Sequence, residues 1–153
     1  MRDVNGLVLR YEGMQVPLVD LPRGDWQPQG KDPGNGMNKY NNRAYGDTDP
    51  KEEYGGAVQN SRPNGWGIWS TEGPPRQEYI GTWKNGQPNG HGMFRLNGTT
   101  IYEGGFLNGK PHGEGRYLGT GETYSGRLRA GRFYGQVACQ KGNTVRMVDL
   151  GGG

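Results

Sequence analysis

Two histidines and one cysteine are the side chains in this sequence best suited to bind a metal or attack a substrate. They are His91, His112 and Cys139, too few to assemble a zinc-type ligand set. No Gly-x-Ser-x-Gly elbow or Ser/His/Asp set is present, and the many Gly-x-Gly pairs open no helix, as a phosphate-binding loop would. We therefore predict a protein that is not an enzyme and that holds no metal and no cofactor.

A cluster of arginines could instead bind an anionic surface. Arg127, Arg129 and Arg132 follow one another closely, so at least two of them could face anionic lipid headgroups together. The net charge is −2 over residues 1–53 and +5 over 54–153. A solvated basic face is the commoner explanation of such an excess. Nucleic-acid binding is not expected, because the dense stripe of basic residues that tracks phosphates is missing.

Glycine and aromatic residues decide the class of fold. The 153 residues include 31 Gly, with nine Tyr, four Trp and three Phe. Glycine weakens helix interiors, whereas aromatic rings bury large areas and tolerate a wet edge at their polar tips. We therefore expect an all-β protein with a thin core of aromatic contacts.

These aromatic residues recur in a repeat. Tyr-x-Gly occurs four times, at Tyr54/Gly56, Tyr79/Gly81, Tyr102/Gly104 and Tyr124/Gly126. A second glycine pair follows each of the first three, at Gly65/Gly67, Gly90/Gly92 and Gly113/Gly115, whereas the fourth unit has Gly135 and Val137. The tyrosines are 25, 23 and 22 residues apart. Repeats of this length indicate a stack of supersecondary units whose terminal unit is atypical.

Each unit is predicted to be one β-hairpin. Tyr79, Gly81 and Trp83 alternate with other residues at the period of a strand, and Asn85-Gly86 supplies a turn. A strand glycine leaves a gap on the face into which a ring from the adjacent strand can lie, and we expect Tyr102 and Trp83 to be such neighbours. About three and a half hairpins are expected over 54–148, followed by a flexible tail at 149–153.

The units resemble the MORN repeat family. The match lies in Tyr79-Ile80-Gly81-Thr82-Trp83-Lys84-Asn85-Gly86, in Tyr102-Glu103-Gly104-Gly105-Phe106-Leu107-Asn108-Gly109 and in Pro111-His112-Gly113-Glu114-Gly115. It is specific over about 79–126 and looser at 54–78 and 127–140, and His112 stands at the family's usual histidine position. The resemblance implies an elongated, twisted antiparallel sheet, and it allows a link to phosphoinositide-rich membranes.

Residues 1–53 lie outside the repeats and are predicted to form a long irregular arm. The segment is rich in Pro, Gly, Asn and Asp, yet it carries isolated aromatic residues at Trp26, Tyr40 and Tyr45. Two interpretations stay open: these side chains anchor the arm on a partner, or the arm folds back along the edge of its own sheet.

Function is predicted to be structural. We expect an accessory subunit of a larger assembly that docks other protein subunits through its aromatic sheet face, with Tyr79, Trp83, Tyr102, Phe106 and Tyr124 at the surface, and through the arm. The competing interpretation is that these rings only stack the repeats. The alternative function is peripheral attachment to anionic lipids through Arg127, Arg129 and Arg132. We expect the protein to be cytoplasmic or organellar, at a location compatible with a membrane or cytoskeletal assembly, and we do not expect it to be secreted.

Overall fold

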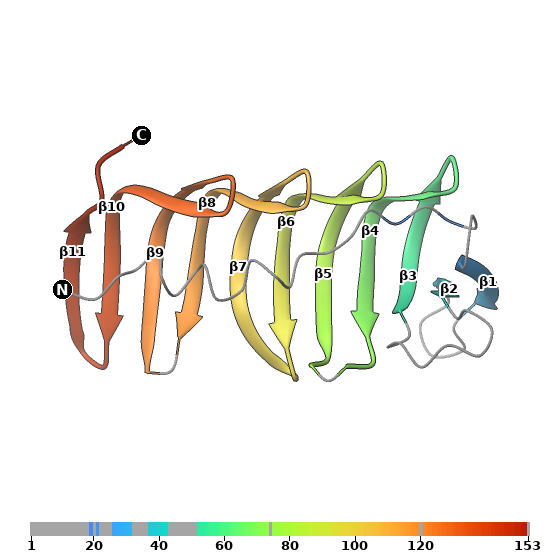
Figure 1. Cartoon of the computed structure of the whole chain (residues 1–153), viewed down its shortest axis with the longest axis horizontal. Helices are drawn as coiled ribbons and strands as arrows, with labels where there is room; N and C mark the ends of the chain where they lie inside the picture. The colour runs from blue at the N-terminus through green and yellow to red at the C-terminus, as the bar shows by residue number, and fades with distance from the viewer. Residues whose placement is uncertain are drawn as a thin grey trace.

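The computed structural model describes residues 19, 21, 26–31, 37–42, 52–73, 75–119 and 121–152. Its strands form one open antiparallel sheet of eleven strands, whose order in space follows their order in the chain (Figure 1). They are β1 (Trp26–Lys31), β2 (Asn38–Asn42), β3 (Glu52–Gln59), β4 (Arg62–Thr71), β5 (Gln77–Lys84), β6 (Gln87–Leu96), β7 (Thr99–Leu107), β8 (Lys110–Gly119), β9 (Glu122–Arg129), β10 (Arg132–Lys141) and β11 (Thr144–Asp149).

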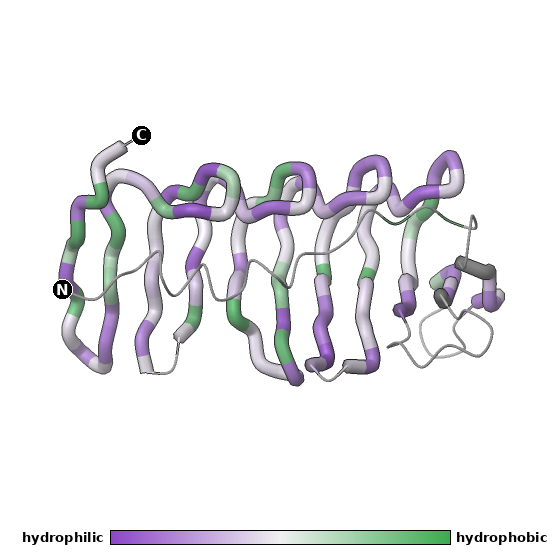
Figure 2. The backbone as a smooth tube through the Cα atoms, in the orientation of Figure 1, coloured by the Kyte–Doolittle hydropathy of each residue, from purple (hydrophilic) through white to green (hydrophobic). Residues whose placement is uncertain are grey.

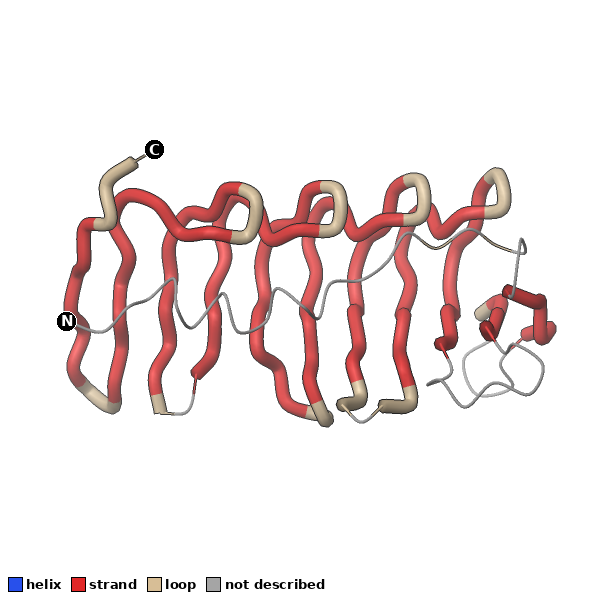
Figure 3. The backbone as a smooth tube through the Cα atoms, in the orientation of Figure 1, coloured by secondary structure: helices blue, strands red, loops and turns tan. Residues whose placement is uncertain are grey.

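The predicted all-β meander is confirmed. Strands and their connections account for the described residues (Figure 3), among which no helix is long and apolar enough to cross a membrane. The hairpins β3–β4, β5–β6, β7–β8 and β9–β10 are all complete, and β11 adds a further strand, so the array is longer than the three and a half hairpins expected.

Both ends of the chain carry more structure than the sequence suggests. Within the segment predicted to be irregular, β1 and β2 extend the sheet beyond β3, which itself begins at Glu52. The expected flexible tail is hydrogen-bonded over its first residues, since the Leu150 amide donates to the Gly135 carbonyl at 2.9 Å and the Gly135 amide donates to the Gly151 carbonyl at 3.1 Å. Gly135 lies at an irregularity of β10, where the ladder with β9 leaves its backbone groups available.

The hairpin turns follow the predicted chemistry. Asn85, Asn97 and Asn108 have φ near +50°, and each is followed by a glycine with φ near +82°. Two consecutive residues in the left-handed region form the turn whose twist matches that of the flanking strands. Ala130 adopts the same conformation before Gly131, so the substitution of Asn by Ala in the last unit preserves the turn.

An aromatic row crosses the sheet from strand to strand. Its members are opposite one another in register on eight consecutive strands: Tyr40, Tyr54, Trp69, Tyr79, Phe94, Tyr102, Tyr117 and Tyr124. Cys139, half-buried, ends the row opposite Tyr124. Directly opposed aromatic pairs are among the cross-strand contacts that stabilise a sheet. We call the face that carries this row the aromatic face and the opposite one the outer face.

A glycine row runs beside the aromatic row and gives the tyrosine rings their place. Gly56, Gly67, Gly81, Gly92, Gly104, Gly115 and Gly126 are opposite one another in succession, and Val137 ends the row. In the first three units the tyrosine ring lies over the glycine of the next strand, so a Cβ on Gly67, Gly92 or Gly115 would overlap Tyr54, Tyr79 or Tyr102 respectively. The row is therefore a steric requirement of the ring positions.

The first glycine in each of the pairs Gly65/Gly67, Gly90/Gly92 and Gly113/Gly115 lies in a β-bulge. In the first hairpin Gly56 pairs with Gly67 and Val58 with Pro63, so Ala57 alone faces three residues of β4. Gly65 lies in this bulge with φ of +101°. The Tyr54 hydroxyl donates a 2.7 Å hydrogen bond to the Ala57 carbonyl, and Tyr79 and Tyr102 bond the equivalent carbonyls at 2.9 and 2.8 Å. Tyrosine and bulge thus stabilise each other.

Each hairpin bends at the bulge toward the aromatic face. Tyr79 and Trp83 stand four residues apart in one strand, yet their rings meet edge to face at 5.2 Å between centroids. The tips of the hairpins accordingly turn over along one edge of the sheet (Figure 1). We call the turned-over parts the ledge (residues 57–66, 82–91, 105–114 and 127–136) and the remainder of β3–β11 the wall.

The inside of the bend holds the core. Trp83 packs between Tyr54 and Tyr79, and Phe106 packs between Tyr79 and Tyr102, all at 4.9–5.2 Å. Each of these edge-to-face pairs contributes about 0.5–1.5 kcal/mol beyond its buried area. The expected contact of Trp83 with Tyr102 is wrong, because the bend directs each ring to the tyrosines of its own and the preceding unit.

Hydrogen bonds also join successive hairpins at their tips. The amides of Gly86, Gly109 and Gly131 donate to the carbonyls of Pro63, Pro88 and Pro111 of the preceding unit at 2.9–3.0 Å. The Trp83 indole donates to the Gly67 carbonyl at 3.2 Å. The ledge is therefore a continuous surface, and its turns are mostly hydrophilic (Figure 2).

Replacing Gly92 by alanine should destabilise the sheet. Its new Cβ would overlap the ring of Tyr79, so we expect Gly92→Ala to lower the free energy of unfolding by about 1–3 kcal/mol in urea denaturation. Gly55→Ala is the matched control, because a Cβ there would meet only ordinary contacts, the nearest at 3.5 Å. Equal midpoints for Gly92→Ala and the parent chain would contradict the packing of ring on glycine.

The buried tyrosines should make the fold sensitive to alkali. Burial raises the pKa of Tyr54, Tyr79 and Tyr102 well above the ordinary value of 10.0. The unfolded chain releases these protons near pH 10 and the folded chain retains them. Stability is therefore complete below that pH and falls above it, by about 1.4 kcal/mol per pH unit for each of the three tyrosines.

A pH titration that records tyrosinate absorbance and far-UV circular dichroism together checks this. Part of the absorbance change should coincide with the loss of β structure. The expectation fails if all nine tyrosines ionise while the dichroism is unchanged.

Candidate functional site

The five aromatic residues predicted to form a docking face are buried inside the chain. Tyr79, Trp83, Tyr102, Phe106 and Tyr124 are between 0% and 7% exposed. The rings of Tyr79 and Tyr102 lie over glycines, and Trp83 and Phe106 pack against them in the bend. The prediction that these residues are presented to a partner is therefore wrong. Their positions agree instead with the competing interpretation, in which these rings only stack the repeats.

Residues of the N-terminal segment that the structure describes pack on their own sheet. Val19 and Leu21 are fully buried in the core, and the Val19 amide donates a 3.0 Å hydrogen bond to the carbonyl of Gly86 at a hairpin tip. Tyr40 is half-buried against the same core. The backbone of Trp26 pairs with that of Asn42, and Tyr45 lies outside the described residues. The described contacts thus favour the interpretation in which the arm folds back on its own sheet.

The three predicted arginines share one face. Leu128 and Phe133 point into the core, so Arg127, Arg129 and Arg132 all point to the outer face. Arg129 is opposite Arg132 in register, and its guanidinium lies 4.8 Å from the centre of the Tyr134 ring. All three arginines are exposed. The geometry that the lipid alternative requires is therefore present.

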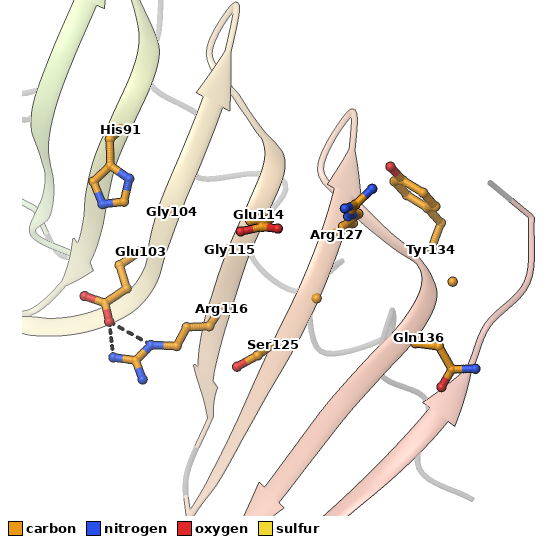
Figure 4. A pocket seen from close by; sticks show the side chains of 12 residues that line it. His91, Glu103, Gly104, Glu114, Gly115, Arg116, Ser125, Arg127, Tyr134 and Gln136 are labelled. Atoms are coloured by element: carbon orange, nitrogen blue, oxygen red, sulfur yellow. Dashed lines mark hydrogen bonds and ion pairs between the residues drawn. The ribbon is translucent and has the colours of Figure 1, made fainter.

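A shallow groove of about 810 Å³ crosses the outer face where the hairpins bend (Figure 4). Its floor includes the backbone of the glycine row at Gly104, Gly115 and Gly126. Its sides carry polar and charged side chains, namely His91, Glu103, Glu114, Arg116, Ser125, Arg127, Tyr134 and Gln136. Arg116 is paired with Glu103 on the wall side of the groove.

An apolar patch continues the same face over β4–β6, and the sequence analysis missed it. Trp66 is 50% exposed, and Ile68 is next to it on the same side of β4. Ile68, Ile80 and Met93 are directly opposite one another on three adjacent strands, all half-buried. The available signal was Trp66 itself, since the equivalent positions of later units carry His91, Glu114 and Gln136.

The candidate chemical residues are dispersed. His91 lines the groove, whereas His112 is in β8 beside Pro111, which is opposite the core residue Phe106. Burial raises the pKa of the Cys139 thiol, with a smaller opposing effect of Arg146, so the thiol is a weak nucleophile at neutral pH. Within the described ranges, no three His, Cys, Asp or Glu side chains gather as metal ligands would.

The repeating hairpin, with its tyrosine over glycine and its Asn-Gly tip, is the unit that comparison with known families detects. The family model of the MORN repeat matches residues 79–99 and 102–122, which cover most of β5–β6 and β7–β8. The chain contains MORN repeats. A search among curated proteins gave no match. MORN repeats occur in scaffold and membrane-associated proteins, and the family is generally non-enzymatic.

The two tryptophans of β4 should respond differently to substitution. Trp66→Ser should change the free energy of unfolding by less than about 0.5 kcal/mol, because the side chain is half exposed on the outer face. Trp69→Ser should lower it by about 3–5 kcal/mol, because that ring is 2% exposed in the aromatic row. Chemical denaturation of both variants measures the difference. A comparable loss in Trp66→Ser would mean that Trp66 is a structural residue.

Proposed function

We propose that this protein is a non-catalytic scaffold that docks a partner protein on its outer face. The observation that carries the proposal is the half-exposed Trp66 beside the Ile68–Ile80–Met93 row. Tryptophan and methionine are enriched at the centres of protein interfaces, and a large aromatic residue on a polar surface is typical of a binding hot spot.

The polar groove adjoins this patch and supports the same proposal. Met93 is opposite Glu103 in register, so the apolar row passes directly into the pair formed by Glu103 and Arg116. An apolar centre beside a rim of charged groups is the usual anatomy of a protein-binding surface. The aromatic face is not available for this role because its rings are buried.

Attachment to an anionic membrane is a second candidate. It is favoured by Arg127, Arg129 and Arg132, which share the outer face of the β9–β10 hairpin. The apolar patch lies over β4–β6, several strands away from these arginines, so no apolar group of the described patch adjoins them that would insert among lipid tails. A scaffold for proteins therefore fits the surface better.

Native size and partner composition test the proposal. Tagged full-length protein from a detergent-free lysate should elute by gel filtration in a complex of fixed stoichiometry, well above its own 16.8 kDa. Trp66→Ser should abolish co-elution of the partner, because it removes the half-exposed ring at the centre of the patch. Val145→Ser is the matched control, since Val145 is 59% exposed on β11, far from the patch.

A photo-reactive residue in place of Met93 should cross-link the same partner that Trp66→Ser loses. Retention of the partner by Trp66→Ser would contradict docking on this patch. Elution as a monomer, with a membrane-bound fraction that salt releases, would favour the arginine face instead.

A further inference from the structure

Strand β11 is an edge of the sheet. Among the described strands it has a neighbour on one side only, β10, and it lies at one end of the array (Figure 1). Five of its six residues are exposed. The described residues after Asp149 do not return along this edge, because the Leu150 amide bonds the Gly135 carbonyl of β10. The side of β11 that faces away from β10 is therefore without a described partner.

The register places β11 at the start of a further repeat unit. Arg146 is opposite Cys139, at the position that a repeat tyrosine has in earlier units, and Val148 is opposite Val137, at the position of a repeat glycine. In those units the equivalent strand is paired on both sides, as β5 is with β4 and β6. The architecture of the repeat therefore has a place for one more strand beside β11.

The turn before β11 determines which backbone groups lie on its open side. Gly142 and Asn143 form a two-residue turn between the opposed pair Lys141/Thr144, and Gly142 has a φ of +59°. The two residues that flank such a turn are hydrogen-bonded to each other, and bonded and non-bonded pairs then alternate along an antiparallel ladder. Every second residue from Thr144 therefore bonds to β10. The residues whose N–H and C=O groups face the open side are Val145, Met147 and Asp149.

Exposed apolar side chains accompany these backbone groups. Val145 and Met147 are 59% and 57% exposed, and both point to the outer face because Val148, the next residue, is buried. They are two of the four large apolar residues that are exposed in the described part of the chain, the others being Trp66 on β4 and Leu107 on β7. An edge with unpaired backbone groups and β-forming side chains is a template for a further strand.

The other edge of the sheet, β1, is protected against pairing. Pro28 has no N–H to donate, and the register with β2 shifts between Pro28 and Lys31, where Gly30 has a φ of +78°. Proline, a bulge and an edge lysine all hinder the addition of a strand. In contrast, β11 contains no Pro, Gly or Lys, and its register with β10 is regular over all six pairs. The edge that best complements β11 is therefore a second β11, and not β1.

We propose that two copies of this chain form a symmetric dimer in which their β11 strands pair antiparallel and join the two sheets into one. The two-fold axis passes beside Met147, which is opposite the second copy's Met147, and Val145 is opposite the second copy's Asp149. All three open-side residues of each strand are then paired, with about six hydrogen bonds across the axis. This goes beyond the proposed function, because the dimer presents two Trp66 patches in one particle.

The alternative registers are less favourable. A shift of two residues in one direction would place Arg146 directly opposite the second copy's Arg146, and opposed like charges are destabilising. The same shift in the other direction would carry Val145 beyond the end of the second strand, which is at Asp149. A shift of one residue would oppose outer-face residues to residues of the aromatic face.

The proposed register covers the exposed apolar side chains. On the outer face, the two Met147 side chains are opposed and each Val145 is diagonal to the other copy's Met147, within the reach of long side chains. On the aromatic face, Arg146 is opposite Val148. Each strand carries one positive and one negative residue, Arg146 and Asp149, so two copies do not repel each other through net strand charge.

Sedimentation velocity of the purified full-length protein tests the dimer. In reducing buffer, over about 10–200 μM, the mass should rise with concentration from 16.8 kDa toward twice that value, because so small an interface gives a weak dimer. Met147→Lys should weaken the dimer at least about tenfold, since it opposes two cations at the axis. Leu107→Lys is the matched control, because it adds the same charge at a residue that is 46% exposed on β7 and should leave the dimer unchanged.

A charge exchange tests the register. Met147→Glu should be monomeric like Met147→Lys, and an equimolar mixture of the two variants should recover the dimer, because these side chains are directly opposite only in the proposed register. Far-UV circular dichroism and the urea midpoint of both variants should match the parent chain, since Met147 is 57% exposed and its side chain is outside the core.

A monomer over the whole concentration range, or a dimer that Met147→Lys retains, would overturn the proposal. So would a mixture of the two charge variants that stays monomeric. Masses that grow beyond two copies would overturn it in favour of head-to-tail joining through β1. Trp66→Ser should leave the dimer unchanged, so loss of the dimer and loss of the docked partner are separate results.

Discussion

The contact between a tyrosine ring and the glycine of the neighbouring strand underlies the rest of this structure. Gly92 leaves a space that the ring of Tyr79 fills, and the Tyr79 hydroxyl bonds the carbonyl of Thr82 at the bulge. The hydrogen bond holds the bend, and the bend brings Trp83 onto Tyr79. The bent sheet thereby builds much of its core from its own aromatic rings, and Val19 and Leu21 of the N-terminal segment complete the described core cluster. Glycine and tyrosine, which are individually poor and good strand formers, act here as one unit.

The fourth unit shows the effect of losing half of this contact. Val137 occupies the position of Gly92 and is itself fully buried, so the ring of Tyr124 cannot lie over it. The Tyr124 hydroxyl bonds the Glu122 carboxylate. Gly135 is still present, because its φ of +67° in the bulge does not depend on the ring. Two glycines that appear as one motif in the sequence therefore have separable roles.

Local features of the fold could be predicted from the sequence, and features that depend on the bend could not. The Asn85-Gly86 turn and the alternation around Gly81 are encoded in neighbouring residues, so strands and hairpins were accessible. Burial of Trp83 results from register across a bulge, which strand periodicity alone does not reveal. The shared face of Arg127, Arg129 and Arg132 could be predicted from strand alternation and a two-residue turn. The patch at Trp66 could be recognised only once the structure showed which face of the sheet is exposed to solvent.

The backbone hydrogen bonds between successive hairpin tips point the same way along the chain. Each later unit supplies the donors, from a turn glycine such as Gly86 and from the Trp83 indole, and the earlier unit supplies the acceptors, Pro63 and Gly67. The tip of a hairpin therefore finds its acceptors in place once the unit before it has folded. Because chains are synthesised from the amino terminus, this array can be built in the order in which it emerges from the ribosome, with no long-range pairing to wait for.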